Sequence, residues 1–252
     1  MFKSLKKILR KNLPEKKYRH LQMLYFRVRA RCITSNLASL ALAYGTDKEG
    51  LHSYCRHYQH HFFKIRKKKL NILEIGIGGY EDPNEGGASL RMWKRYFPKS
   101  KIYGIDIYDK SFHDDGRIRT YKGSQIDEVF LKRIVDEIGK IDIVIDDGSH
   151  LNEHVISTFK ILFPLISKNA IYAIEDLQTS YWTNHANVNW GGSKDLEAPH
   201  TSMNFLKTLV DCPNHKDFEI ELYQPTYFDQ NITSVHFYSK LAFIYKNKGI
   251  IL

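Results

Sequence analysis

The sequence predicts an α/β protein with a doubly wound, mostly parallel sheet of seven strands and an antiparallel hairpin at its C-terminal end. From residue 70 onward, short β-branched segments alternate with amphipathic segments of helical spacing, which is typical of parallel crossovers. Only the Ser239-Lys240 region separates the last two apolar segments, which is the spacing of an antiparallel hairpin. Acids and glycines gather just after the predicted strands, where ligands bind in such sheets.

Each expected strand or helix is inferred from a run of apolar residues with a single periodicity. Strands are expected where the runs are short and end in a glycine or an acid, at 71–76, 101–107, 117–123, 141–147 and 169–176. Helices are expected where apolar residues recur on one helical face, at 88–97, 128–138 and 154–166. Three further strand-like segments follow near the end, at 218–223, 233–239 and 241–247, and the last two form the expected hairpin.

The net charge of +10 lies at the start of the chain. The first 31 residues hold eleven Lys or Arg and one acid, which leaves 27 basic and 27 acidic residues in the remainder. Phe2, Leu5, Ile8 and Leu13 have nearly helical spacing in this part, and Pro14 should end that helix. We therefore predict a basic amphipathic helical arm, residues 1–35, before a domain that spans residues 36–252.

The arm has three interpretations. It packs on the domain or on a sister subunit, which leaves a homo-oligomer open, or it holds the protein to the surface of an anionic membrane. A nucleic-acid arm is less favoured, because nothing here resembles a base-reading module. The lysines exclude a secretory signal, and no apolar run reaches the ~20 residues of a membrane span. Three scattered cysteines without metal-binding spacing favour a cytoplasmic location, either free or at the inner face of the membrane.

The turn after the first strand carries glycines at positions 76, 78 and 79, which alone could be a simple tight turn. Asp106, at the tip of the next strand, is placed to accept hydrogen bonds from a ribose diol. The polar turn at 121–127 could hold an adenine edge. Glu81 replaces the third glycine of a dinucleotide motif, and Glu74 sits poorly near a pyrophosphate, so S-adenosylmethionine fits better than a nicotinamide cofactor.

The segment IDIVIDDGSH, residues 141–150, ends a strand on two acids and a histidine. If the fourth and fifth strands are neighbours, about 4.8 Å apart, Asp147 approaches Glu175 and Asp176. Three carboxylates this close repel one another unless a divalent cation lies among them, with Mg²⁺ favoured and Mn²⁺ or Ca²⁺ allowed. Alternatively, these acids cap the helices that follow. His150 would lie beside the ion and suits a general base.

Several motifs, in order along the chain, resemble the metal-dependent sugar O-methyltransferases: YGTDK, LEIGIGG, GASLRMWKRYFP, YGIDI, DDGSH, EDLQTSYW and VHFYS. The resemblance implies the Rossmann-like class I S-adenosylmethionine methyltransferase sheet. It implies that Asp147, Glu175 and Asp176 bind magnesium and that His150 is the base. The cofactor-binding positions predicted on this basis are Tyr44, Thr46, Lys48, Glu74, Gly76, Asp106, Ser124, Gln125 and Asp146.

The predicted function is therefore Mg²⁺-dependent methyl transfer from S-adenosylmethionine to a sugar hydroxyl in a glycan, glycolipid or glycosylated metabolite. Trp182 and Tyr181, just after the metal acids, either stack on the sugar or pack within the fold. One alternative is a methyltransferase or hydroxylase that acts on a non-sugar small molecule. Another is a membrane- or RNA-associated module that binds a nucleoside without catalysis.

Overall fold

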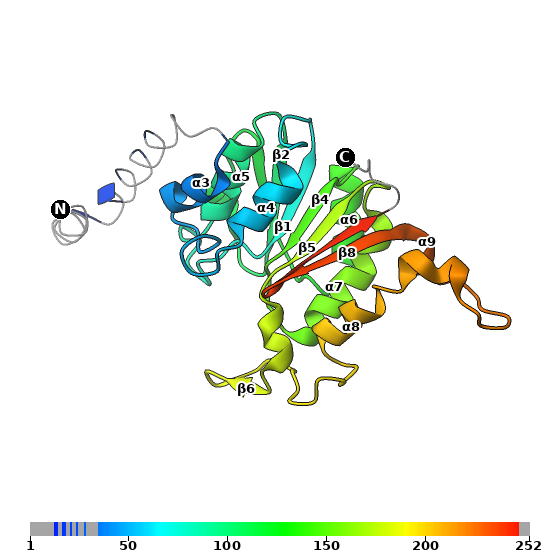
Figure 1. The fold of residues 1–252 in the computed structure, drawn as a ribbon. Helices are drawn as coiled ribbons and strands as arrows, with labels where there is room; N and C mark the ends of the chain where they lie inside the picture. Colours follow the sequence, from blue (N-terminus) through cyan, green and yellow to red (C-terminus); the bar gives the residue numbers. More distant parts are fainter. Residues whose placement is uncertain are drawn as a thin grey trace.

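The computed structural model describes residues 35–246 and, before them, Leu13, Pro14, Lys17, Tyr18, Leu21, Leu24 and Val28. Almost all of the predicted arm, residues 1–35, thus lies outside the described residues. The central sheet has seven strands in the order β3-β2-β1-β4-β5-β9-β8 (Figure 1). Their bounds are Asn71–Ile75 (β1), Lys101–Asp106 (β2), Ile118–Lys122 (β3), Ile143–Asp146 (β4), Ile171–Ile174 (β5), Ile232–Tyr238 (β8) and Leu241–Lys246 (β9).

The predicted fold class is confirmed by the pairing of these strands. The first five strands pair in parallel, and β9 runs antiparallel to both β5 and β8. β4 and β5 are neighbours, with Asp146 opposite Ile174. The acids that follow these two strands therefore meet at one edge of the sheet.

Helices cover both faces of the sheet (Figure 1). One face packs on α3 (Leu37–Tyr44), α4 (Cys55–Phe62) and α5 (Ala88–Tyr96). The other packs on α6 (Glu128–Ile138), α7 (Asn152–Leu165) and α8 (Ser202–Thr208). The shorter elements are η1 (Ser111–His113), η2 (Leu177–Tyr181), β6 (Asn184–His185), β7 (Val188–Asn189), η3 (Cys212–Asp217) and α9 (Tyr227–Asn231).

The alternation of side chains along β1 determines which face of the sheet each residue points to. Leu73 and Ile75 belong to the core beneath α6 and α7, whereas Ile72 belongs to the core beneath α4 and α5. Successive side chains of a strand point to opposite faces, so Glu74 shares the face of Ile72. Its carboxylate is therefore directed into the α4–α5 layer.

The predicted strand at 218–223 is wrong. Phe218, Ile220 and Leu222 alternate with polar residues, as in a half-buried strand, but this segment pairs with no strand in the described part of the chain. Ile220 is 60% exposed and Leu222 is 92% exposed, with a φ of 60° at Leu222. The alternation therefore marks no buried face here, and β8 forms the edge of the sheet.

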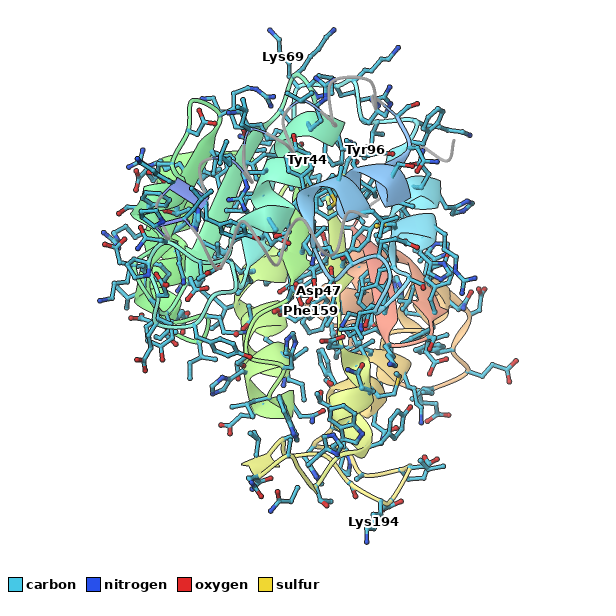
Figure 2. The ribbon with its side chains drawn as sticks, turned by 90° about the vertical axis from the view of Figure 1, so that its left-hand side faces the viewer. Tyr44, Asp47, Lys69, Tyr96, Phe159 and Lys194 are labelled. Atoms are coloured by element: carbon cyan, nitrogen blue, oxygen red, sulfur yellow. The ribbon has the colours of Figure 1, made fainter. Side chains whose placement is uncertain are left out.

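The two ends of the central strands face opposite ends of the molecule. Lys69, just before β1, and Lys194, in the loop region after β5, lie at opposite ends of the molecule (Figure 2). The site described below lies at the carboxyl ends of the strands, on the Lys194 side. Across residues 35–246 and the few described positions before them, no helix combines the length and the apolar character that crossing a membrane requires.

Candidate active site

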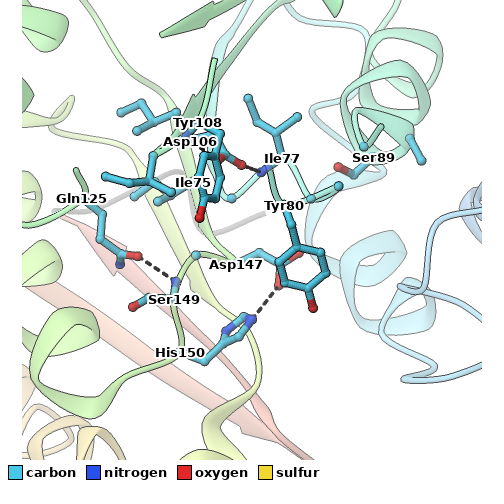
Figure 3. A pocket seen from close by; sticks show the side chains of 18 of the residues that line it. Ile75, Ile77, Tyr80, Ser89, Asp106, Tyr108, Gln125, Asp147, Ser149 and His150 are labelled. Atoms are coloured by element: carbon cyan, nitrogen blue, oxygen red, sulfur yellow. Dashed lines mark hydrogen bonds and ion pairs between the residues drawn. The ribbon is translucent and has the colours of Figure 1, made fainter. Parts of the chain in front are cut away.

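A cavity of about 740 Å³ lies at the carboxyl ends of β1, β2 and β4 (Figure 3). The loops after these strands supply its walls, from the glycines that follow β1, past Asp106, to Asp147 and His150. Ligands in doubly wound sheets bind at this position. Five of the predicted cofactor-binding residues thus share one cavity with Asp147 and His150: Thr46, Gly76, Asp106, Ser124 and Gln125.

Gly76 forms the point where the loops after β1 and β4 touch. Its φ is 85°, and a Cβ at this position would lie 2.0 Å from the carbonyl oxygen of Asp147. The Asp147 amide donates to the Ile75 carbonyl at 3.0 Å and thereby ties the two loops together. Only glycine permits both this backbone conformation and this contact.

Asp106 has the geometry expected for a ribose-binding carboxylate. Its Oδ2 accepts a hydrogen bond from the Ile77 amide at 2.9 Å, and its Oδ1 accepts one from the Tyr108 amide at 2.9 Å. A carboxylate offers about four acceptor positions. The two backbone donors therefore fix the side chain at the cavity wall and leave acceptor capacity for a diol.

Thr46, Ser124 and Gln125 also line the cavity, as predicted for cofactor-binding positions. The Gln125 side chain has a second task, because its Oε1 accepts from the Ser149 amide at 2.7 Å. Its Nε2 donates to Thr158 Oγ1 at 3.0 Å. Gln125 therefore joins the turn after β3 to the turn that carries His150.

Four predicted cofactor-binding residues do not line the cavity: Tyr44, Lys48, Glu74 and Asp146. Tyr44 packs against the core beneath α5. The Glu74 carboxylate is fully buried and accepts hydrogen bonds from Ser89 Oγ at 2.8 Å and Trp93 Nε1 at 3.2 Å. The strand alternation described above explains this orientation and leaves Glu74 without a place in the cavity wall.

Asp146 lies at the end of β4 but points into the sheet. Its Oδ2 accepts a hydrogen bond from the Tyr172 hydroxyl at 3.3 Å, and burial raises the pKa of Asp146 to about 7. The neighbouring Asp147 points the other way, as expected for successive residues at the end of a strand. Asp147, and not Asp146, therefore faces the cavity.

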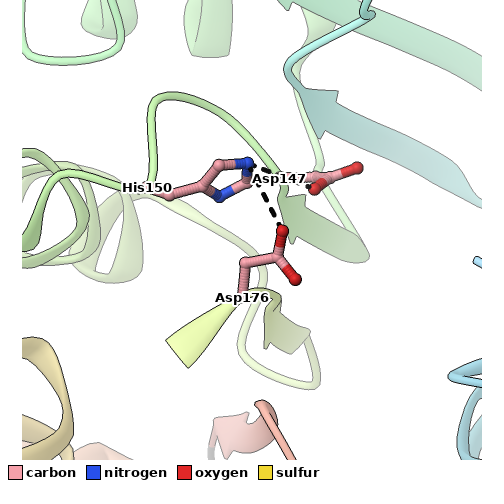
Figure 4. Close-up of side chains that lie close together, drawn as sticks. All are labelled: Asp147, His150 and Asp176. Carbon is pink, nitrogen blue, oxygen red and sulfur yellow. Dashed lines mark ion pairs between the residues drawn. The ribbon is translucent and has the colours of Figure 1, made fainter. Parts of the chain in front are cut away.

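Asp147, His150 and Asp176 form a compact group (Figure 4), and the first two of them line the cavity. Each offers one ligand atom, and these atoms lie within 4.8 Å of one another. His150 Nε2 is 3.8 Å from Asp147 Oδ1 and 3.7 Å from Asp176 Oδ2. His150 and Asp176 have φ values of 58° and 54°, a strained conformation that folds retain mainly at functional sites.

Glu175, the third predicted metal ligand, lies behind this group. It is 3% exposed, and its Oε1 accepts hydrogen bonds from Lys48 Nζ at 2.7 Å and from the Tyr58 hydroxyl at 2.5 Å. Burial, together with the charge of Asp147, raises the pKa of Glu175 well above its usual value. The structure thus assembles two of the three predicted acids around His150 and gives Glu175 other partners.

The electrostatics of Asp176 differ from those of Glu175. Burial alone would raise the pKa of Asp176, but nearby His150 and the hydrogen bond from Tyr54 lower it below its usual value. Asp176 therefore carries its negative charge beside His150. The carboxylates of Asp147 and Asp176 are hard oxygen ligands of the kind that suits Mg²⁺ or Mn²⁺, and His150 lies beside them.

The alternative in which these acids cap helices is contradicted. The N-cap of α7 is Leu151, which makes no side-chain capping bond. Asp176 occupies the N-cap position of η2, and its side chain also makes no capping bond. The carboxylates of Asp147 and Asp176 are thus directed at His150 and at donors from the α3–α4 region.

Relatives of this chain share a large part of its sequence and its fold, although no family model matches it. It is 45% identical over 211 residues to "8-demethyl-8-alpha-L-rhamnosyl tetracenomycin-C 2'-O-methyltransferase" of Streptomyces olivaceus, which covers 83% of this chain and 54% of that protein. It is 44% identical to "Mycinamicin VI 2''-O-methyltransferase" of Micromonospora griseorubida, over 85% of this chain and 53% of that protein. A crystal structure of MycE methyltransferase in complex with Mg and SAH superposes with a TM-score of 0.80 at 44% identity, covering 86% of this chain and 54% of that one.

Over this shared region, the chain belongs to the sugar O-methyltransferase family. The predicted resemblance is thereby confirmed. The chain spans about half the length of the curated relatives it matches.

The cavity also has a wall that the sequence did not predict. Trp190, directly after the β6–β7 hairpin, lines the cavity together with His154 and Tyr80. The Trp190 carbonyl accepts hydrogen bonds from the amide of Asn152 at 3.1 Å and from its Nδ2 at 2.9 Å. Trp190 follows an irregular polar segment with no periodic pattern, so its aromatic character was the only available signal.

Proposed function

We propose that this chain transfers a methyl group from S-adenosylmethionine to a sugar hydroxyl, with a divalent metal ion held by Asp147 and Asp176 and with His150 beside it as the base. The observation that carries the proposal is the single cavity that joins Asp106 to Asp147 and His150. The relatives support the substrate class: one methylates the 2'-O position of a rhamnosyl tetracenomycin, and MycE was crystallised with Mg, SAH and mycinamycin VI. We accordingly propose a glycosylated metabolite as the acceptor.

The chain's own residues divide the work between two ends of the cavity. Asp106 binds the ribose hydroxyls of the cofactor, while Gly76 and Thr46 form the adjacent walls. When bound, S-adenosylmethionine supplies an electrophilic methyl group, and the metal ion polarises the acceptor hydroxyl. The cavity holds donor and acceptor in contact, which removes much of the entropic barrier to their reaction.

His150 removes the proton from the acceptor hydroxyl. In this step the hydroxyl oxygen bonds to the methyl carbon, the carbon–sulfur bond breaks, and the proton passes to His150 Nε2. Asp147 Oδ1 and Asp176 Oδ2, 3.8 Å and 3.7 Å from that nitrogen, stabilise the positive charge that develops on the imidazole. Glu175 lies buried behind the group and does not line the cavity.

Trp190 is the aromatic residue best placed to bind the acceptor sugar. Trp190 lines the cavity and its Nε1 donates to the His185 carbonyl at 2.9 Å, whereas the ring of Trp182 stacks on His185 with 4.2 Å between centroids. Tyr181 is 46% exposed and is absent from the cavity lining. An indole face is suited to the apolar face of a pyranose, so we assign the stacking role to Trp190 rather than to Trp182 or Tyr181.

Methyl transfer to defined glycosides tests the proposal. The purified chain is incubated with methyl-labelled S-adenosylmethionine and an L-rhamnosyl polyketide glycoside or its aglycone, in Mg²⁺ or in EDTA. We expect label on the glycoside only, with Mg²⁺ only. Label on the aglycone would favour the non-sugar methyltransferase, and cofactor binding without turnover on any glycoside would favour the non-catalytic module.

A further inference from the structure

One short segment of the chain supplies a hydrogen-bond donor to each of the three predicted metal acids. Lys48 Nζ donates to Asp147 Oδ2 at 2.6 Å. The hydroxyl of Tyr54, the N-cap residue of α4, donates to Asp176 Oδ1 at 2.6 Å. The hydroxyl of Tyr58, one turn later, donates to Glu175 Oε1 at 2.5 Å.

These donors divide the oxygens of Asp147 and Asp176 into two sets. Asp147 Oδ2 and Asp176 Oδ1 are anchored by the 48–58 segment. The other oxygens, Asp147 Oδ1 and Asp176 Oδ2, face His150. A carboxylate with one oxygen held in this way can no longer rotate freely, so its second oxygen stays turned toward the shared centre.

The donors themselves are held in a dry, well-packed environment. Lys48 and Tyr58 have no exposed surface, and Tyr54 is 1% exposed. The Tyr58 ring packs against Trp93 and Phe243, with centroids 5.1 Å and 5.2 Å away. A hydrogen bond from such a fixed donor orients its acceptor more strongly than one from a mobile surface side chain.

We propose that Lys48 and Tyr54 are positioning residues that preset Asp147 and Asp176 for a divalent metal ion, and that Tyr58 supports them by holding Glu175 behind them. This inference rests on the proposed function. It moves Lys48 from the cofactor site, where the sequence placed it, to the support of the acids. It also assigns to the two tyrosines a role that neither their spacing nor their apolar surroundings would suggest.

The test removes single hydroxyl groups and measures metal affinity directly. Tyr54→Phe and Tyr58→Phe keep the aromatic rings and their packing and delete only the donors. We expect Tyr54→Phe to weaken binding of Mn²⁺ or Mg²⁺ by about 10- to 100-fold in calorimetry, which is the usual effect of losing a partner of a metal ligand. Tyr58→Phe, whose acceptor Glu175 lies behind the ligands, should weaken binding by a smaller factor. Turnover should fall at limiting Mg²⁺ and recover when Mg²⁺ is saturating.

Tyr96→Phe is the matched control. Tyr96 is buried in the same core on α5, and its hydroxyl has no hydrogen-bond partner among the described residues. Its loss should leave metal affinity unchanged. Melting temperatures of all four proteins in EDTA show whether the fold is intact.

The outcomes separate this inference from the proposed function. If the unmodified chain binds neither Mn²⁺ nor Mg²⁺, the proposed metal site itself fails. If the unmodified chain binds metal and both tyrosine variants bind it equally well, the positioning role is overturned while the proposed function stands. Equal weakening in the Tyr96→Phe control would also overturn it, because the effect would then be a general one.

Discussion

At the scale of single residues, His150 combines an unfavourable backbone with a favourable electrostatic position. A histidine with a φ of 58° is under strain of about 1–3 kcal/mol, which the surrounding contacts must offset. The turn is fixed by the Gln125 side chain at Ser149 and by the Ser149 hydroxyl, which lies 2.9 Å from His154 Nδ1. These contacts thus hold the imidazole between two carboxylates and keep the His150 backbone in its left-handed conformation.

Replacing His150 with Asn tests whether it is the base. Asn tolerates the left-handed conformation and keeps a polar side chain, but it cannot take up the proton. We expect kcat to fall about 10²- to 10⁴-fold, the usual contribution of general base catalysis, with unchanged affinity for S-adenosylhomocysteine. Steady-state kinetics and calorimetry measure the two quantities. Activity within a few-fold of the unmodified chain would exclude a proton-transfer role.

From the sequence, one can predict which residues meet at this site only where those residues follow neighbouring strands. Asp147 and Asp176 follow adjacent strands, and their approach to His150 follows from that order. The orientation of Glu175 does not, because its partners Lys48 and Tyr58 lie 127 and 117 positions away in the chain. Such contacts depend on how α4 packs on the sheet, which no local pattern specifies.

At the scale of elements, the predicted strands and helices with strong periodicity are present, and their ends differ by a few residues. The helix at 128–138 is observed as Glu128–Ile138, and the helix at 154–166 as Asn152–Leu165. The short α4, CRHYQHHF, escaped prediction because it is rich in histidine and low in mean hydropathy, although its buried residues Cys55, Tyr58 and Phe62 have helical spacing. Segment 218–223 shows the opposite error. Its apolar and polar residues alternate as in a strand, but it pairs with no strand among the described residues.

α4 also packs on the C-terminal hairpin through a buried histidine. His61 Nδ1 lies 2.7 Å from the Tyr245 hydroxyl, and its Nε2 lies 3.0 Å from the Tyr238 hydroxyl. Its ring stacks on Phe243 with 3.9 Å between centroids. Burial lowers the pKa of His61 to about 3.

This histidine should make stability depend on pH. Because its pKa is lower in the folded than in the unfolded chain, the unfolded chain binds more protons as pH falls below about 6.5. The free energy of unfolding should therefore fall toward acid pH, by up to about 1.4 kcal/mol per pH unit from this group. In urea unfolding between pH 7 and pH 5, His61→Gln should show a shallower slope than the unmodified chain. The exposed His200→Gln should not, and equal slopes for His61→Gln and the unmodified chain would remove His61 as the cause.

At the scale of the whole molecule, the cofactor end of the cavity joins loops from four parallel strands. Residues after β1, β2, β3 and β4 all line it. A ligand that binds there only in the folded state stabilises the entire domain, because these four strands are consecutive neighbours that make up more than half of the sheet. The metal group lies at the other end, so the two sites can be separated in solution.

S-adenosylhomocysteine should raise the melting temperature, and Asp106 should be responsible. At 100 times its dissociation constant, a ligand adds about 2.7 kcal/mol to the free energy of unfolding. For a domain of this size that corresponds to roughly 5–10 °C. In Asp106→Asn, the amide nitrogen would face the Ile77 or Tyr108 amide, donor against donor, and one ribose acceptor would be lost. The shift should therefore largely disappear, measured by differential scanning fluorimetry.

Asp109→Asn is the control for this experiment. Asp109 lies in the same loop, its Oδ1 accepts from the Ser111 amide at 2.9 Å, and its side chain does not line the cavity. It should keep the full shift. The shift in the unmodified chain should also persist in EDTA, because Asp106 lies apart from the Asp147–His150–Asp176 group. A shift that EDTA abolished would mean that the cofactor and metal ends do not bind independently, and an undiminished shift in Asp106→Asn would remove Asp106 from the cofactor site.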